Sequence, residues 1–154
     1  MGDKTGQVRS RFPTAVAVVA AFGFIATGLA AMAAPQAFFD AVATFDPYNQ
    51  HFVQDIGAFN LGIGVTLLMA QRPGFDGLLA ALAGAAVAAG AHVTSHVVGH
   101  QLGGTPLLDI PLFGGLTILL VTAAIIRHRD LATARPHSSP GTTPRAGQDT
   151  ARRH

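Results

Sequence analysis

The 154-residue sequence contains no cysteine, no tryptophan and a single tyrosine, and only 12% of it is Asp, Glu, Lys or Arg. The absence of cysteine excludes disulfides, thiolate nucleophiles and cysteine-ligated metal centres. The charged fraction is about half that of an ordinary soluble domain and leaves too few charges to cover a soluble surface. Hydrophobic residues make up 49% of the chain, and the mean hydropathy is +0.40. This composition indicates one membrane-embedded domain.

Four apolar stretches are long enough to cross about 30 Å of hydrocarbon at about 1.5 Å per residue. They cover residues 15–34, 52–70, 78–98 and 107–126. The third stretch is mostly Ala, Gly, Leu and Val, and it is the weakest candidate because Ala and Gly contribute little to membrane insertion, although no charge interrupts residues 77–99. The sequence therefore predicts an all-α fold, a transmembrane four-helix bundle over residues 13–129, preceded by a short segment at residues 1–12.

The positions of the basic residues predict the orientation of this bundle. All ten Lys and Arg residues lie before the first stretch, between the second and third, or after the fourth. The other two connections contain none, so the positive-inside rule places both termini in the cytoplasm and these two loops outside. This role accounts for the basic residues and argues against nucleic-acid binding. The first stretch is longer than a signal-peptide core, so we expect a retained helix, with cleavage as the alternative.

Two segments outside the four stretches have patterns of their own. Residues 35–50 carry Phe38, Phe39, Val42 and Phe45 at near-helical spacing, with Asp46-Pro47 at the end. This favours a short amphipathic helix on the outer membrane surface, or alternatively a loop packed on the bundle. Residues 130–154 are rich in Pro, Ser, Thr, Gly and Arg without periodicity, which predicts a disordered cytoplasmic tail.

Small residues in all four stretches predict how the helices pack. Lipid provides no hydrophobic drive for helices to associate, so close contact depends on Gly and Ala. The pairs Ala80–Gly84 and Ala85–Ala89 give the third helix small faces, and we expect it to lie at the centre of the bundle. The short connections on either side predict antiparallel contact with the second and fourth helices.

Polar residues within the stretches predict one shared site. His92, His96 and His100 repeat every four residues and form one stripe on the third helix. His51 and Asp55 are also four apart, and Asp109 begins the fourth helix on the same side of the membrane. We therefore expect a polar cluster in the outer half of the membrane, made of His51, Asp55, His92, His96, His100 and Asp109.

This cluster has several interpretations. A structural one pairs Asp55 with His96 or His100, because ionisable residues in a membrane face the bundle and pair. A second is a divalent metal site built from His92, His96, His100 and Asp55. A haem held by histidines of the second and third helices, or a proton-linked or small-molecule pocket, are further alternatives. No nucleophile motif, phosphate loop or dinucleotide fingerprint is present, so no catalytic residue is assigned and a non-enzymatic role is favoured.

The second stretch also carries a family resemblance. Residues 51–64, HFVQDIGAFNLGIG, resemble the second helix of small bacterial four-helix membrane proteins of DoxX-like architecture. The resemblance implies a four-helix bundle and, for some relatives, an accessory role beside membrane redox enzymes; the lack of cysteine argues against thiol redox chemistry. The Ala-, Gly- and Arg-rich composition suggests a bacterium with a GC-rich genome, and hence the bacterial inner membrane.

Together these observations favour a non-enzymatic accessory or small-ligand-binding subunit of the membrane. A metal- or haem-binding redox protein and a small oligomeric transporter are the alternatives. The lipid bilayer is the expected environment, with a second copy of the chain or another membrane protein as the expected partner.

Overall fold

The computed structural model describes residues 10–72, 74 and 77–134. Within these residues every regular element is a helix. The elements are α1 (Phe12–Ala33), α2 (Pro35–Phe38), the π-helical turn η1 (Phe39–Ala43), α3 (Gln50–Met69), α4 (Leu78–Val98) and α5 (Pro106–Thr133). Helices α1, α3, α4 and α5 are each long and apolar enough to cross a membrane. The prediction of an all-α, multi-pass membrane protein with four spans is confirmed.

Local sequence signals explain where the helices begin. Pro13 lies in the first turn of α1 and Pro106 is the first residue of α5, positions where the missing proline N–H costs nothing. Asn49 caps α3, because its side-chain oxygen accepts a hydrogen bond from the backbone N–H of Phe52 at 3.1 Å. These residues lie close to the helix starts expected from hydropathy alone.

The end of α5 differs from the expectation. The helix continues to Thr133, so residues 130–133, which were predicted to begin a disordered tail, are helical. Asp130 in this last turn accepts a hydrogen bond from the backbone N–H of Ser10 at 3.2 Å, which joins the start of α1 to the end of α5. The predicted disorder of residues 135–154 and the structure of residues 1–9 lie outside the described residues.

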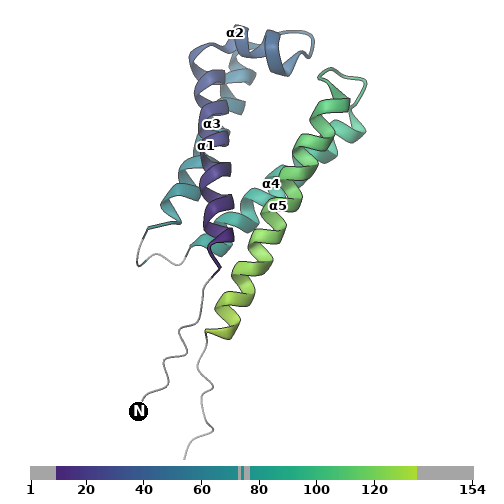
Figure 1. Ribbon diagram of the computed structural model, residues 1–154. Coiled ribbons are helices and arrows are strands. Elements are labelled where there is room, and N and C mark those ends of the chain that lie inside the picture. The colour runs from purple at the N-terminus through teal and green to yellow at the C-terminus, as the bar shows by residue number, and fades with distance from the viewer. Residues whose placement is uncertain (1–9, 73, 75–76, 135–154) are drawn as a thin grey trace, which may run out of the picture.

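The four long helices form two pairs (Figure 1). Helices α1 and α3 pack along each other, and α4 and α5 do the same. The pairs meet at the end that carries Arg11, Arg72, Arg127 and Arg129, called here the basic end. They diverge toward the opposite end, called here the loop end, where α2, η1 and the connection 99–105 lie. The arrangement is thus more open than the compact bundle predicted from the sequence.

Close backbone contact between α1 and α3 explains this pairing. A Cβ on Gly28 would lie 2.8 Å from the carbonyl oxygen of Gly57, and a Cβ on Gly64 would lie 2.8 Å from that of Ala21. Such close approach requires glycine at positions 28 and 64, and in lipid contacts of this kind drive helix association. The main neighbour of α3 is therefore α1, and its contact with α4, expected from the short connection, is limited.

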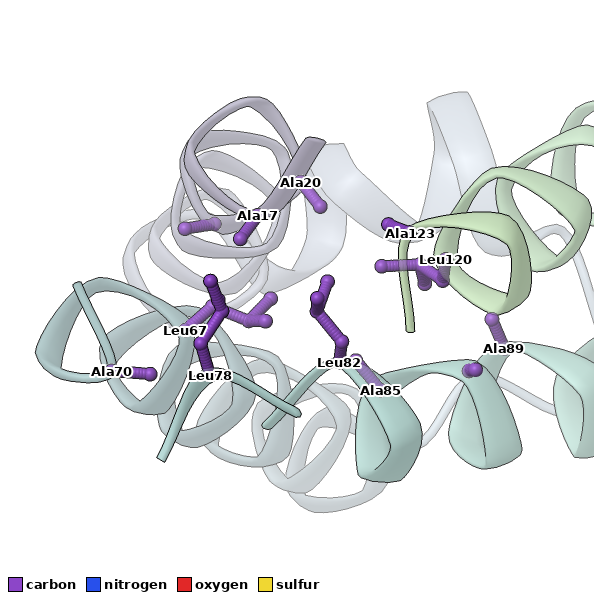
Figure 2. Close-up of a cluster of buried hydrophobic side chains, with 12 residues drawn as sticks. Ala17, Ala20, Leu67, Ala70, Leu78, Leu82, Ala85, Ala89, Leu120 and Ala123 are labelled. Atoms are coloured by element: carbon purple, nitrogen blue, oxygen red, sulfur yellow. The ribbon is translucent and has the colours of Figure 1, made fainter. Parts of the chain in front are cut away.

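A core at the basic end holds the two pairs together (Figure 2). The side chains of Leu67 from α3, Leu82 from α4 and Leu120 from α5 are fully buried and meet the alanines of α1. The small residues Ala85 and Ala89 let α4 approach its neighbours closely. Helix α4 thus has more than one neighbour, but it packs mainly on α5 and only to a limited extent on α3 and α1, so it does not take the central place predicted for it.

At the loop end, the segment 35–49 folds over the α1–α3 pair. Phe39 is buried there, with its ring 5.2 Å from that of Phe45 and 5.0 Å from that of Tyr48. The helix predicted for this segment is present as α2 and η1, and it ends at Thr44 in the left-handed conformation (φ 36°), before Asp46-Pro47. It therefore combines both predicted forms, a short helix and a segment packed on the bundle.

Candidate functional site

The structure divides the six predicted site residues into three groups. His92 and His96 of α4 lie together with Asp109 of α5. His51 and Asp55 lie together on α3. His100 follows α4 and contacts the backbone of its own chain segment.

His92, His96 and Asp109 form a continuous chain of ionisable side chains, called here the His–His–Asp chain. Nε2 of His92 lies 3.2 Å from Nε2 of His96, within hydrogen-bond distance. On the other side of the second ring, Nδ1 of His96 lies 3.6 Å from Oδ2 of Asp109. The spacing of four residues on α4 places both rings on one helix face, and the start of α5 supplies the carboxylate.

Phe113 of α5 holds both imidazole rings. Its ring is stacked on that of His96 at 5.3 Å and meets that of His92 edge to face at 4.3 Å. Phe113 was not among the residues predicted for the site, although it follows Asp109 by four residues and therefore shares its helix face. An aromatic residue one helical turn after Asp109 was the sequence signal that could have predicted this contact.

The backbone before α5 fixes Asp109. Its Oδ2 accepts a hydrogen bond from the N–H of Thr105 at 2.6 Å, in the first turn of the helix, where a negative charge is favourable. Gly104 adopts a positive φ of 78° and lies against the same carboxylate, because a Cβ added there would be 2.8 Å from Oδ2. The loop thus leaves the carboxylate little room to turn away from His96.

The His51–Asp55 pair is a separate and more exposed group. The two side chains lie 3.6 Å apart with 87% and 51% of their surfaces exposed, against 24% and 16% for His96 and Asp109. The predicted pairing of Asp55 with His96 or His100 is thus replaced by two pairings, His51 with Asp55 and His96 with Asp109. The physical reason is the divergence of the helix pairs at the loop end, which separates α3 from α4 there (Figure 1).

His100 does not extend the chain. It lies beyond Gly99, which ends α4, and its Nδ1 lies 3.2 Å from the carbonyl oxygen of Val97. Within residues 10–72, 74 and 77–134, no group of three or more His, Cys, Asp or Glu side chains is arranged to hold a metal. The predicted four-residue metal set is therefore not assembled, and only its two members His92 and His96 meet.

A groove of about 570 Å³ opens between α3 and α4. It is lined mainly by small and apolar side chains, including Ala58, Gly62 and Thr66 of α3 and Ala80 and Gly84 of α4. These three α3 residues continue the helix face of Asp55. In the structure this face borders an open groove, because α3 packs on α1 with its other side.

No family model, curated protein or solved structure matches the chain. The structure itself shows four helices long and apolar enough to span a membrane, with a His–His–Asp chain between α4 and α5.

Proposed function

We propose that this protein is a non-enzymatic membrane subunit that binds a small ligand at the His–His–Asp chain. The observation that carries the proposal is the continuous contact of His92, His96 and Asp109. Ionisable side chains in membrane helices are costly and usually mark a functional site. Here three of them lie in contact, and Phe113 packs on the two imidazole rings. His92 keeps an exposed surface through which a ligand can reach the rings.

The distribution of arginine supports an inner-membrane location with both termini in the cytoplasm. In the part of the chain that the structure describes, every arginine lies at the basic end, and the loop end has no Lys or Arg. Under the positive-inside rule the loop end faces outward, and the His–His–Asp chain belongs to the outer half of the membrane. The resemblance of residues 51–64 to DoxX-like proteins supports an accessory role in a bacterial membrane.

The hydroxyl groups next to the histidines support a binding role rather than hydrolysis. Ser95 Oγ donates to the carbonyl oxygen of His92 at 2.7 Å, and Thr94 Oγ1 donates to that of Gly90 at 2.8 Å. Both hydroxyls are therefore engaged with the helix backbone. A serine nucleophile needs the opposite arrangement, with its hydroxyl donating to a histidine nitrogen.

Native mass spectrometry of the protein extracted from its own membrane tests this proposal. We expect a bound low-mass species on the wild type and its loss in His96→Ala and Asp109→Asn. His51→Ala is the matched control, because His51 lies outside the His–His–Asp chain. This variant should retain the bound low-mass species. A wild type with no bound species, or turnover of a substrate that is lost in His96→Ala, would contradict the proposal.

A further inference from the structure

The facing ring nitrogens of His92 and His96 have the geometry of a metal-binding pair. We propose that these two Nε2 atoms bind a divalent transition-metal ion, with Asp109 orienting the second imidazole. The inference rests on the proposed function, because it names the chemical class of the ligand held by the same site.

The separation of the two nitrogens carries the inference. A tetrahedral zinc ion bound to two imidazoles at about 2.0–2.1 Å holds their nitrogens about 3.3 Å apart. The observed Nε2–Nε2 distance is 3.2 Å. An ion can therefore take the place of a shared proton between the rings with little movement of either side chain.

Asp109 occupies the position of a carboxylate behind a metal-binding histidine. A ligating histidine usually donates its other ring N–H to a carboxylate, which fixes the tautomer and makes the ligating nitrogen more basic. The 3.6 Å approach of Asp109 Oδ2 to His96 Nδ1 places the carboxylate on this side of the ring. A proton on Nδ1 leaves the lone pair of Nε2 directed toward His92.

The surroundings restrict the class of ion. Two imidazole nitrogens suit Zn²⁺, Cu²⁺ and Ni²⁺, whereas Ca²⁺ and Mg²⁺ require oxygen ligands. Since the described residues assemble no third protein ligand at this site, the remaining coordination positions belong to water or to an exogenous ligand. The exposed surface of His92 leaves that side of the ion open.

Isothermal titration of the untagged, full-length protein in detergent with Zn²⁺ or Ni²⁺ alone tests the inference. We expect one site that is lost in His96→Ala and weakened at least 100-fold in His92→Ala. Asp109→Asn should weaken binding about 10- to 100-fold, as loss of a carboxylate behind a metal ligand does. His100→Ala is the matched control, because this histidine lies just beyond the end of α4 and outside the pair, and it should bind within twofold of the wild type.

His92→Cys separates metal ligation from a structural role, because a thiolate also binds zinc. We expect this variant to recover zinc affinity that His92→Ala has lost, with circular dichroism showing equal helix content in both. Wild-type affinity in His92→Ala, or loss of binding in His100→Ala, would overturn the assignment.

The two proposals fail separately. If the wild type binds no metal but retains a low-mass organic species that His96→Ala loses, the metal assignment is wrong and the proposed function stands. If the wild type binds neither, both are wrong.

Discussion

Gly104 donates its backbone N–H to Oγ1 of Thr44 at 3.1 Å, across 60 residues of sequence. This bond connects the two helix pairs at the loop end, where their long helices have diverged. Thr44 follows η1, which covers the α1–α3 pair, and Gly104 lies over the Asp109 carboxylate between α4 and α5. The segment 35–49 thereby contributes to the position of the His–His–Asp chain without supplying a residue to it.

Replacing Thr44 with valine tests this connection. Thr44→Val keeps the shape of the side chain and removes the acceptor, so the Gly104 amide should lose protection from hydrogen exchange. A net hydrogen-bond contribution of about 0.5–1.5 kcal/mol corresponds to an increase of roughly 2- to 10-fold in exchange rate. Thr94→Val is the matched control, since that hydroxyl bonds only within α4. Equal exchange at Gly104 in all three proteins would show that the bond does not hold the loop.

A methyl group at Gly104 should disturb the site. In Gly104→Ala the new Cβ would lie 2.8 Å from Asp109 Oδ2, so the carboxylate must shift from its present position beside His96. We expect at least a 10-fold loss of zinc affinity in titration calorimetry. Gly74→Ala imposes a similar backbone strain, at φ 81°, with no neighbour within 4 Å of the Cβ. If both variants lose affinity equally, the effect belongs to general strain rather than to the site.

Two glycines of α1 give a matched test of the α1–α3 interface. Gly28→Ala places a Cβ 2.8 Å from the Gly57 carbonyl oxygen, whereas Gly23→Ala meets nothing within 4 Å. Overpacking against backbone should cost Gly28→Ala about 1–3 kcal/mol of unfolding free energy. Gly23→Ala should be as stable as the wild type or more stable by up to about 1 kcal/mol, because alanine is more favourable than glycine inside a helix. Unfolding in sodium dodecyl sulfate titrations measures both, and equal stabilities would contradict the close helix contact.

The absence of cysteine allows the orientation to be tested with single introduced cysteines. Gln101→Cys lies at the loop end and Gln71→Cys at the basic end. A membrane-impermeant maleimide applied to intact cells should label position 101 and reach position 71 only after permeabilisation. The reverse labelling would invert the proposed orientation and place the His–His–Asp chain in the inner half of the membrane.

The spans were predictable from the sequence because length and apolar composition are properties of each helix alone. The same is true of the i, i+4 contacts within a helix, such as His92 with His96 and His51 with Asp55. Both are set by helical periodicity, whatever the neighbouring helices do.

The contacts between helices were harder to predict. Helix α3 contains three glycines, Gly57, Gly62 and Gly64. In the structure Gly57 and Gly64 touch α1, whereas Gly62 faces open space, and the sequence does not distinguish between them. The face of α3 that carries Gly57 and Gly64 packs on α1, and the divergence of the two helix pairs at the loop end separates Asp55 on the other face from His96. The predicted polar cluster between α3 and α4 required a closed bundle. Whether two helix pairs diverge depends on contacts between helices, which no local sequence pattern predicts.

The property that we propose for the site is that Asp109 acts on His96, and through His96 on His92, rather than on His51 or His100. Long-range ¹H–¹⁵N spectra of the histidine side chains, recorded without metal on the wild type and on Asp109→Asn, measure this directly. We expect the imidazole nitrogens of His96 to shift most and those of His92 to follow, while His51 and His100 keep their wild-type positions. An unchanged His96, or shifts of equal size at His51, would show that the three residues do not form a separate site between α4 and α5.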